Sequence, residues 1–121
     1  MGRLMKGFWR GFYFAWQGLV HVFRYERNAR VHLVFAVFAF IVGLILHVTD
    51  TQLAAIFFAV ILVFLAEIFN TAIEKTLDLI DTKPNHQIMI IKDMAAGAVL
   101  VAAIAAVMIG VVIFGPYLVR L

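Results

Sequence analysis

The chain has 121 residues, of which 65% are hydrophobic and 14% are charged, and it contains no cysteine. This composition excludes an ordinary soluble domain, and the lack of cysteine excludes disulfides and thiolate metal sites. The net charge is +3, and six of the ten Lys and Arg residues lie within residues 1–30, interleaved with aromatic residues. Such a pattern favours lipid headgroups over nucleic acid as the partner, so we expect a membrane protein. The length of the chain allows one compact unit.

The first predicted element, residues 1–30, is an amphipathic helix that lies in the membrane interface. Its aromatic side chains alternate with Arg, Lys, Gln and His, as is typical of interfacial helices. The alternative is a poor transmembrane helix. No small-residue cleavage site follows a short apolar core, so we do not predict a signal peptide.

Three further helices are predicted at residues 31–48, 53–80 and 88–115, each containing a transmembrane span. The eighteen residues of the first rise about 27 Å, which is enough to cross the hydrocarbon core. The fold class is therefore an all-α membrane bundle with three spans. Turn-forming residues at 81–86 are expected to connect the second and third of these helices.

Two helix ends have local signals. Asp50 or Thr51 is expected to cap the start of the second span, because short polar side chains accept hydrogen bonds from free backbone amides. The pair Gly115-Pro116 is expected to end the third span, because proline lacks the amide donor.

Lys and Arg residues also predict the orientation. The loop after the first span contains none, whereas Lys75, Lys83 and Lys92 flank the loop after the second. Since positive loops remain in the cytoplasm, we expect the N-terminus inside and the C-terminus outside.

The stretch from residue 66 to 78 carries the strongest chemical signal. A continuous helix places Glu67, Asn70, Glu74 and Asp78 within an arc of roughly 80°. Glu67 is the deepest in the membrane, where an unpaired carboxylate costs roughly 2 to 3 kcal/mol or more. A chain this apolar is expected to tolerate that cost for a chemical role.

Oxygen ligands suggest a magnesium site. Glu26 and Glu74 lie at the cytoplasmic ends of their helices, and Mg²⁺ usually takes one or two carboxylates together with phosphate oxygens and water. Lys92, beside Asp93, can supply positive charge to a phosphate chain. The glycine-rich loop G-x-x-x-x-G-K-[ST] is absent, so a nucleotide is not bound in the P-loop manner.

Each signal also has a structural explanation. Glu74 can be a solvated helix end, and Lys92 with Asp93 a simple interfacial ion pair. His32 and His47 are interpreted as interfacial anchors. The competing class of function is a non-enzymatic membrane protein that binds cations or serves as an assembly subunit.

Small residues recur every four positions in the third span. They are Ala98, Ala102, Ala106 and Gly110. This spacing lets helices approach closely in lipid, either within the chain or between chains. Three helices can scarcely enclose a polar site alone, so we expect oligomerisation.

Several stretches resemble parts of a known family. The signature E-x-x-N-T/S-A-I-E-x-x-x-D of the small prokaryotic diacylglycerol/undecaprenol kinases is similar to residues 67–78. The second signature of that family resembles residues 92–100, and its N-terminal part resembles residues 16–19 and 26–32. The resemblance covers essentially the whole chain.

The resemblance implies a kinase of a membrane lipid alcohol in the bacterial inner membrane, dependent on ATP and Mg²⁺. It further implies a homotrimer in which neighbouring chains share cytoplasmic sites. Glu67 would be the general base, and Glu26 and Glu74 would bind the metal and the nucleotide. The form E-R-N-x-R-I/V-H at residues 26–32 resembles the undecaprenol-phosphorylating branch, which favours undecaprenol over diacylglycerol.

Other positions carry implied roles around the nucleotide and the lipid. Asn70, Lys92 and Asp93 would shape the nucleotide and phosphate region. The remaining implied site residues are Trp16, Arg30 and Asp78.

The sequence departs from the family pattern at three positions. Gly7 lies nearest an arginine of some relatives, Phe14 replaces a tyrosine of the nucleotide site, and His86 is one residue away from the usual histidine. These departures concern the adenine contacts and the loop before Lys92.

Overall fold

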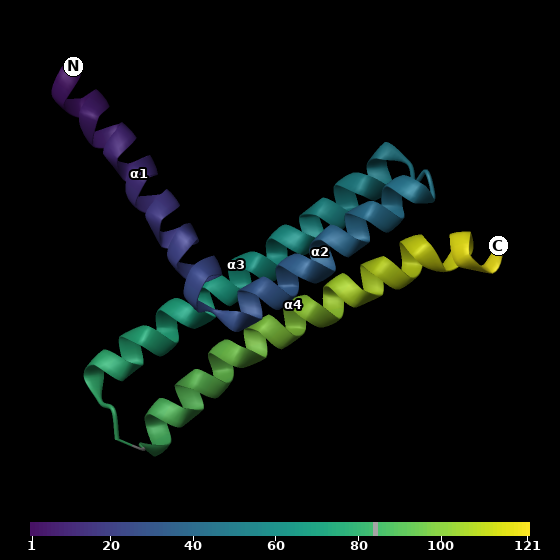
Figure 1. Ribbon diagram of the computed structural model, residues 1–121. Coiled ribbons are helices and arrows are strands. Elements are labelled where there is room, and N and C mark those ends of the chain that lie inside the picture. The colour runs from purple at the N-terminus through teal and green to yellow at the C-terminus, as the bar shows by residue number, and fades with distance from the viewer. Residues whose placement is uncertain (84) are drawn as a thin grey trace.

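The computed structural model describes residues 1–83 and 85–121, and in these ranges the chain forms four α-helices and no β-strand (Figure 1). The helices are α1 (Gly2–Tyr25), α2 (Arg27–Ile45), α3 (Asp50–Ile80) and α4 (His86–Val119). The all-α prediction is confirmed. Helices α2, α3 and α4 are long and apolar enough to cross a membrane, as expected for the three predicted spans.

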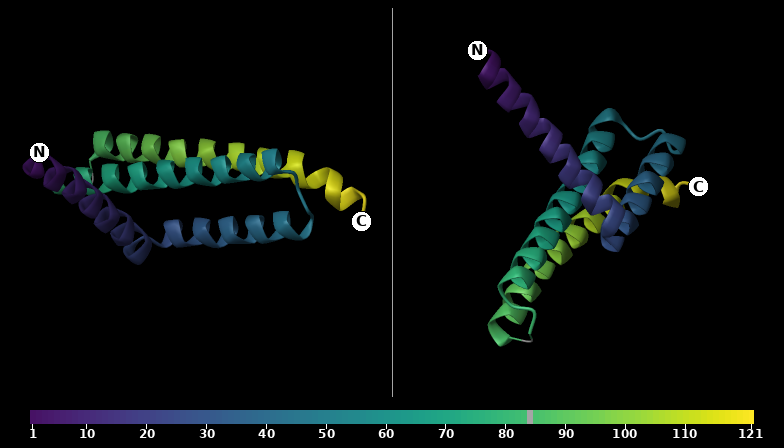
Figure 2. Two further views of the ribbon diagram at one scale, coloured as in Figure 1. Left: turned by 90° about the horizontal axis from the view of Figure 1, so that it is seen from above. Right: turned by 60° about the vertical axis from the view of Figure 1, so that its left-hand side comes forward.

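Helix α1 points away from the other three helices (Figures 1 and 2). Val22 is its one buried residue, and its aromatic side chains are largely exposed. Near its end, Phe23 packs edge-on against Phe64 of α3, with 5.4 Å between the ring centroids. An exposed aromatic and basic helix fits the predicted interfacial position.

A break at Glu26 separates α1 from α2, whereas we expected one helix over residues 1–30 and the next from residue 31. Glu26 has extended backbone angles, φ −102° and ψ 115°. The Arg30 guanidinium donates to the carbonyl oxygen of Arg24 at 2.6 Å and to that of Phe23 at 3.4 Å. These carbonyls lie in the last turn of α1, where helical partners are missing, so Arg30 stabilises the break.

Helix α2 ends at Ile45, three residues before the expected boundary, in a Schellman motif. His47 has a φ of 55°, the amide of Val48 donates to the carbonyl of Gly43 at 3.1 Å, and that of His47 donates to Leu44 at 3.3 Å. The left-handed residue turns the chain and satisfies carbonyls at the helix end.

Thr49 caps α3, not Asp50 or Thr51 as expected. Its hydroxyl accepts from the amide of Gln52 at 3.2 Å, and the side chain of Gln52 accepts from the amide of Thr49 at 3.0 Å. This reciprocal capping box satisfies two amides at once, which explains why the helix begins at Asp50.

Helices α3 and α4 form the main packing contact of the bundle, and α2 packs against α3. Ala102 of the small-residue stripe is buried, as is Ala95 one heptad earlier, whereas Ala98 is exposed. Figure 2 shows α3 and α4 side by side over most of their length. The stripe therefore contributes to packing within the chain.

Both ends of α4 differ from the expected range of 88–115. Asn85 caps the helix, because its Oδ1 accepts from the amide of Gln87 at 2.9 Å and from that of Ile88 at 3.4 Å. The helix continues through Pro116 to Val119, whereas we expected it to end at Gly115-Pro116. The connection expected at residues 81–86 includes Pro84, which lies outside the described residues.

Candidate active site

The centre of the site is one face of α3. Glu67 is only 3% exposed, Asn70 and Thr71 are also buried, and Glu74 is half-buried. The amide Nδ2 of Asn70 lies 3.4 Å from Oε1 of Glu74 and donates to it. The predicted alignment of Glu67, Asn70 and Glu74 is therefore present, and it faces the interior of the bundle.

Helix α2 places His32 next to the buried carboxylate of Glu67. Its Nε2 lies 3.7 Å from Oε2 of Glu67. The buried residues of α2 are Ala29, Ala36 and Gly43, spaced by seven, and they mark the face that packs on α3. His32 lies three residues after Ala29 and four before Ala36, so it is on this face and contacts Glu67, a contact that its interpretation as an interfacial anchor did not include.

The break between α1 and α2 brings in the third carboxylate. Oε1 of Glu26 lies 3.7 Å from Nζ of Lys75 on α3. Glu26 and Glu74 both lie close enough to Glu67 to act on it electrostatically. Glu26, Glu67 and Glu74 thus lie in one region where α3 meets the start of α2, and within the described residues His32 and Lys75 are the basic side chains at ion-pair distance from any of them.

From the sequence, His32 was interpreted as an interfacial anchor, and Lys75 was given no role in the site. For His32, the signal was the seven-residue spacing of Ala29, Ala36 and Gly43, which predicts the packed face of α2. Lys75 follows Glu74 directly, and its pairing with Glu26 depends on where the α1–α2 break occurs. We find no sequence signal for that pairing.

The donors present fit a magnesium ion. Glu26, Glu74 and Asn70 offer hard oxygen ligands, and Oδ1 of Asn70 is buried without a hydrogen-bond partner in the described structure. Across residues 1–83 and 85–121, no group of three acidic or histidine side chains is arranged to hold a metal ion alone. Mg²⁺ bound here would complete its ligand shell with phosphate oxygens and water.

Other expected site residues lie outside this cluster. Nζ of Lys92 on α4 lies 2.7 Å from Oδ1 of Asp78 on α3, beyond Glu74 along that helix. Asp93 is exposed, and Trp16 is exposed on α1, away from the bundle. Arg30 is engaged with the carbonyls at the end of α1. A single chain therefore gathers the carboxylates and Asn70, but not all the residues expected around a nucleotide.

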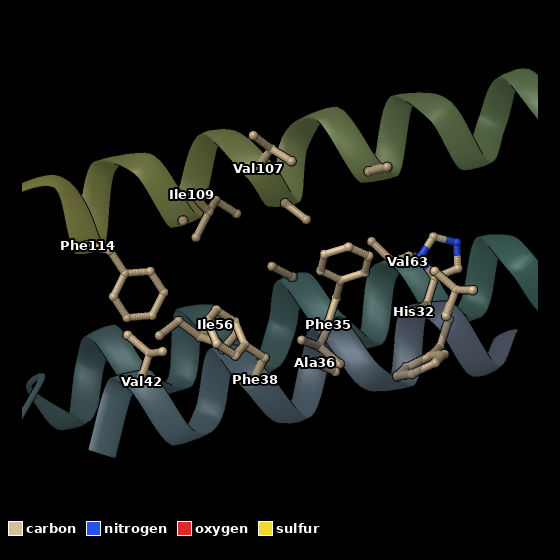
Figure 3. Close-up of a pocket in the computed structure, with 18 of the residues that line it drawn as sticks. His32, Phe35, Ala36, Phe38, Val42, Ile56, Val63, Val107, Ile109 and Phe114 are labelled. Atoms are coloured by element: carbon tan, nitrogen blue, oxygen red, sulfur yellow. The ribbon is translucent and has the colours of Figure 1, made fainter. Parts of the chain in front are cut away.

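An apolar cavity of about 630 Å³ lies between α2, α3 and α4 (Figure 3). His32 is the one residue with a polar side chain among the described residues that line it. In Figure 3 His32 lies at one end of the cavity and Phe114 at the other. The apolar cavity thus runs along the three helices, and the end lined by His32 lies near Glu67.

The family model described as prokaryotic diacylglycerol kinase matches residues 13–114, which include the whole carboxylate cluster. The chain belongs to this family. The resemblance stated from the two signatures is thereby confirmed, and the three apolar helices agree with a membrane-embedded kinase.

Two relatives of this kinase family have names that specify a lipid substrate. The chain is 38% identical over 111 residues to a diacylglycerol kinase of Synechocystis sp., covering 91% of this chain and 63% of that protein. It is 37% identical over 114 residues to an undecaprenol kinase of Bacillus subtilis, covering 94% of this chain and 93% of that protein. The chain thus spans less than two thirds of the first relative and nearly all of the second. Both relatives favour a lipid kinase over the non-enzymatic alternative.

Proposed function

We propose that this protein transfers the γ-phosphoryl group of ATP to the hydroxyl group of a membrane lipid alcohol, in a reaction that depends on Mg²⁺. The observation that carries this proposal is Glu67. It is almost fully buried on a face shared with Asn70 and Glu74, at the position where the family signature has its first glutamate. Family membership supports the class of reaction.

Glu67 acts as the general base in this proposal. Its carboxylate accepts the proton of the lipid hydroxyl, the hydroxyl oxygen forms a bond to the γ-phosphorus, and the bond from that phosphorus to the bridging oxygen breaks to release ADP. The depth of Glu67 suits a substrate that presents its alcohol at the bilayer surface while its tail remains in lipid.

Glu26 and Glu74 are the residues we assign to Mg²⁺, with Asn70 beside them. When bound, the ion neutralises charge on the phosphates of the nucleotide. Lys92 is the cation we assign to the phosphates, and Asp93 follows it. Lys92 is now paired with Asp78 at 2.7 Å, so phosphate binding would exchange one anionic partner for another.

Undecaprenol is the substrate we favour over diacylglycerol. Residues 26–32 have the form E-R-N-x-R-V-H that resembles the undecaprenol-phosphorylating branch. The Bacillus subtilis relative named undecaprenol kinase also matches over nearly its whole length.

The assembly we propose is a homotrimer in the bacterial inner membrane, with the N-terminus and the carboxylate cluster on the cytoplasmic side. Trp16 and Asp93 are exposed in a single chain, which supports a site completed by a neighbouring chain. The distribution of Lys and Arg supports the orientation.

The test is phosphoryl transfer from radiolabelled ATP to purified lipids. The protein in detergent is incubated with Mg²⁺ and either undecaprenol or diacylglycerol, and the labelled lipid is separated by chromatography. We expect product with both lipids and a higher kcat/KM for undecaprenol. A higher kcat/KM for diacylglycerol would reverse the substrate assignment, and no labelled lipid from either would refute the kinase proposal.

A further inference from the structure

The contact between His32 and Glu67 joins two helices at the deepest point of the site. Nε2 of His32 lies 3.7 Å from Oε2 of Glu67, which is an ion-pair distance and longer than a direct hydrogen bond. Catalytic contacts are often long before substrate binds and shorten in the complex. The side chain of Glu67 is 3% exposed and that of His32 is 25% exposed, so solvent weakens this contact little.

The other charged groups near Glu67 are of the same sign. Glu74 faces it from α3 and Glu26 from the α1–α2 break, and the side chain of Asn28 on α2 is a further polar neighbour. Lys75 is paired with Glu26. Within the described residues, His32 is therefore the one basic side chain at ion-pair distance from Glu67, which two carboxylates also face.

We infer that His32 is a positioning residue: it holds the carboxylate of Glu67 at the end of the apolar cavity, where the hydroxyl group of the lipid must arrive. This inference rests on the proposed function. Two observations support this positioning role: the imidazole of His32 lies beside the carboxylate of Glu67, and His32 also lines the apolar cavity. A base that can swing away from the end of the cavity would lose its alignment with the alcohol, and alignment accounts for much of the catalysis in phosphoryl transfer.

The role can be separated from simple filling of space by two substitutions. His32→Leu keeps an apolar side chain at the end of the cavity but removes the donor, whereas His32→Gln retains an N–H donor at a similar reach. His21→Leu is the matched control, because His21 is exposed on α1, where it contacts Tyr25. Each variant is assayed for kcat, for the KM values of ATP and lipid, and for its thermal unfolding midpoint.

For His32→Leu we expect kcat to fall at least about tenfold with an unchanged KM for ATP, as is seen when a group that orients a catalytic side chain is removed. His32→Gln should recover several-fold of the lost rate, and His21→Leu should match the wild type. A wild-type kcat in His32→Leu, or equal rates for the Leu and Gln variants, would overturn the inference.

A further variant at residue 32 and the activity of the wild type separate the remaining outcomes. If His32→Leu does not fold, His32→Asn replaces it, because the amide of Asn is too short to reach Glu67; a rate for Gln above that for Asn supports positioning, and equal rates refute it. Failure of the proposed function looks different, because the wild type itself would then phosphorylate no lipid.

Discussion

The hydroxyl of Tyr117 donates a 2.6 Å hydrogen bond to Oε1 of Gln52, the same oxygen that accepts from the amide of Thr49 at 3.0 Å. One side-chain oxygen therefore fixes both the start of α3 and the last turn of α4. Figure 1 shows these two helix ends on the same side of the bundle. The contact also explains why α4 stays helical beyond Pro116, since its last turn is tied to a neighbouring helix.

Loss of this contact should lower stability without lowering activity. Tyr117→Phe removes one hydrogen bond and should cost about 1 kcal/mol, and Gln52→Ala removes half of the capping box as well and should cost about 2 kcal/mol. The free energies of unfolding are compared with the lipid kinase rates in the same detergent. A Gln52→Ala variant as stable as the wild type would show that the contact contributes nothing.

The left-handed residue at the end of α2 gives a second stability prediction. His47 has a φ of 55° and an exposed side chain, so the strain is not offset by buried contacts of its ring. His47→Gly should raise the free energy of unfolding by up to about 1 kcal/mol, and His47→Val should lower it by at least as much. Thermal unfolding of the two variants beside the wild type checks this. A loss of stability in His47→Gly would mean that the imidazole itself stabilises the turn.

The helices could be predicted from the sequence because long apolar runs dominate their energetics. Their ends could not, because each depends on a few polar contacts. The pattern T-x-x-Q at residues 49–52 was a visible capping-box signal, yet Asp50 and Thr51 are also good capping residues and competed with it. Pro116 was a misleading signal, because helix packing in membrane proteins makes proline tolerable.

In the candidate site, the arrangement of residues within one helix could be predicted, whereas contacts between helices could not. Glu67, Asn70 and Glu74 share one helix, so the helical period alone aligns them. The pairings of His32 with Glu67 and of Lys75 with Glu26 join different helices. The pairing of Lys75 with Glu26 depends on the α1–α2 break at Glu26, which aromatic and basic composition does not reveal, whereas His32 is placed by the face of α2 that packs on α3.

The orientation in the membrane has a direct test. The chain has no cysteine, so single cysteines introduced at Asp50 and Lys83 are the only thiols in each variant. Asp50 begins α3 and Lys83 follows its end, which places the two residues at opposite ends of that helix. An impermeant thiol reagent should label Asp50→Cys from outside intact cells and Lys83→Cys only after the cells are opened. Labelling of both from one side would contradict the three-span topology.

Magnesium dependence tests the assigned metal ligands. Glu74→Gln keeps the shape of the side chain and removes its charge, so the Mg²⁺ concentration for half-maximal rate should rise at least about tenfold and the maximal rate should fall. Glu26→Gln should behave in the same way. The control is Asp50→Asn, a carboxylate change at the far end of α3, which should leave the Mg²⁺ dependence unchanged. If Glu74→Gln resembles this control, Glu74 does not bind the metal.

The assignment of Glu67 as the base is tested by measuring rate and stability together. Glu67→Gln removes the proton acceptor, and the rate of lipid phosphorylation should fall by about 10²-fold or more, the usual contribution of a general base. The substitution also removes a buried negative charge that faces Glu26 and Glu74. The variant should therefore be at least as stable as the wild type and should still bind ATP. The thermal midpoint, the binding of ATP and the kinase rate are measured in one detergent, with Asp50→Asn as the control. A near-normal rate would end the assignment, whereas loss of both rate and folded structure would mean that Glu67 serves the fold through its contact with His32.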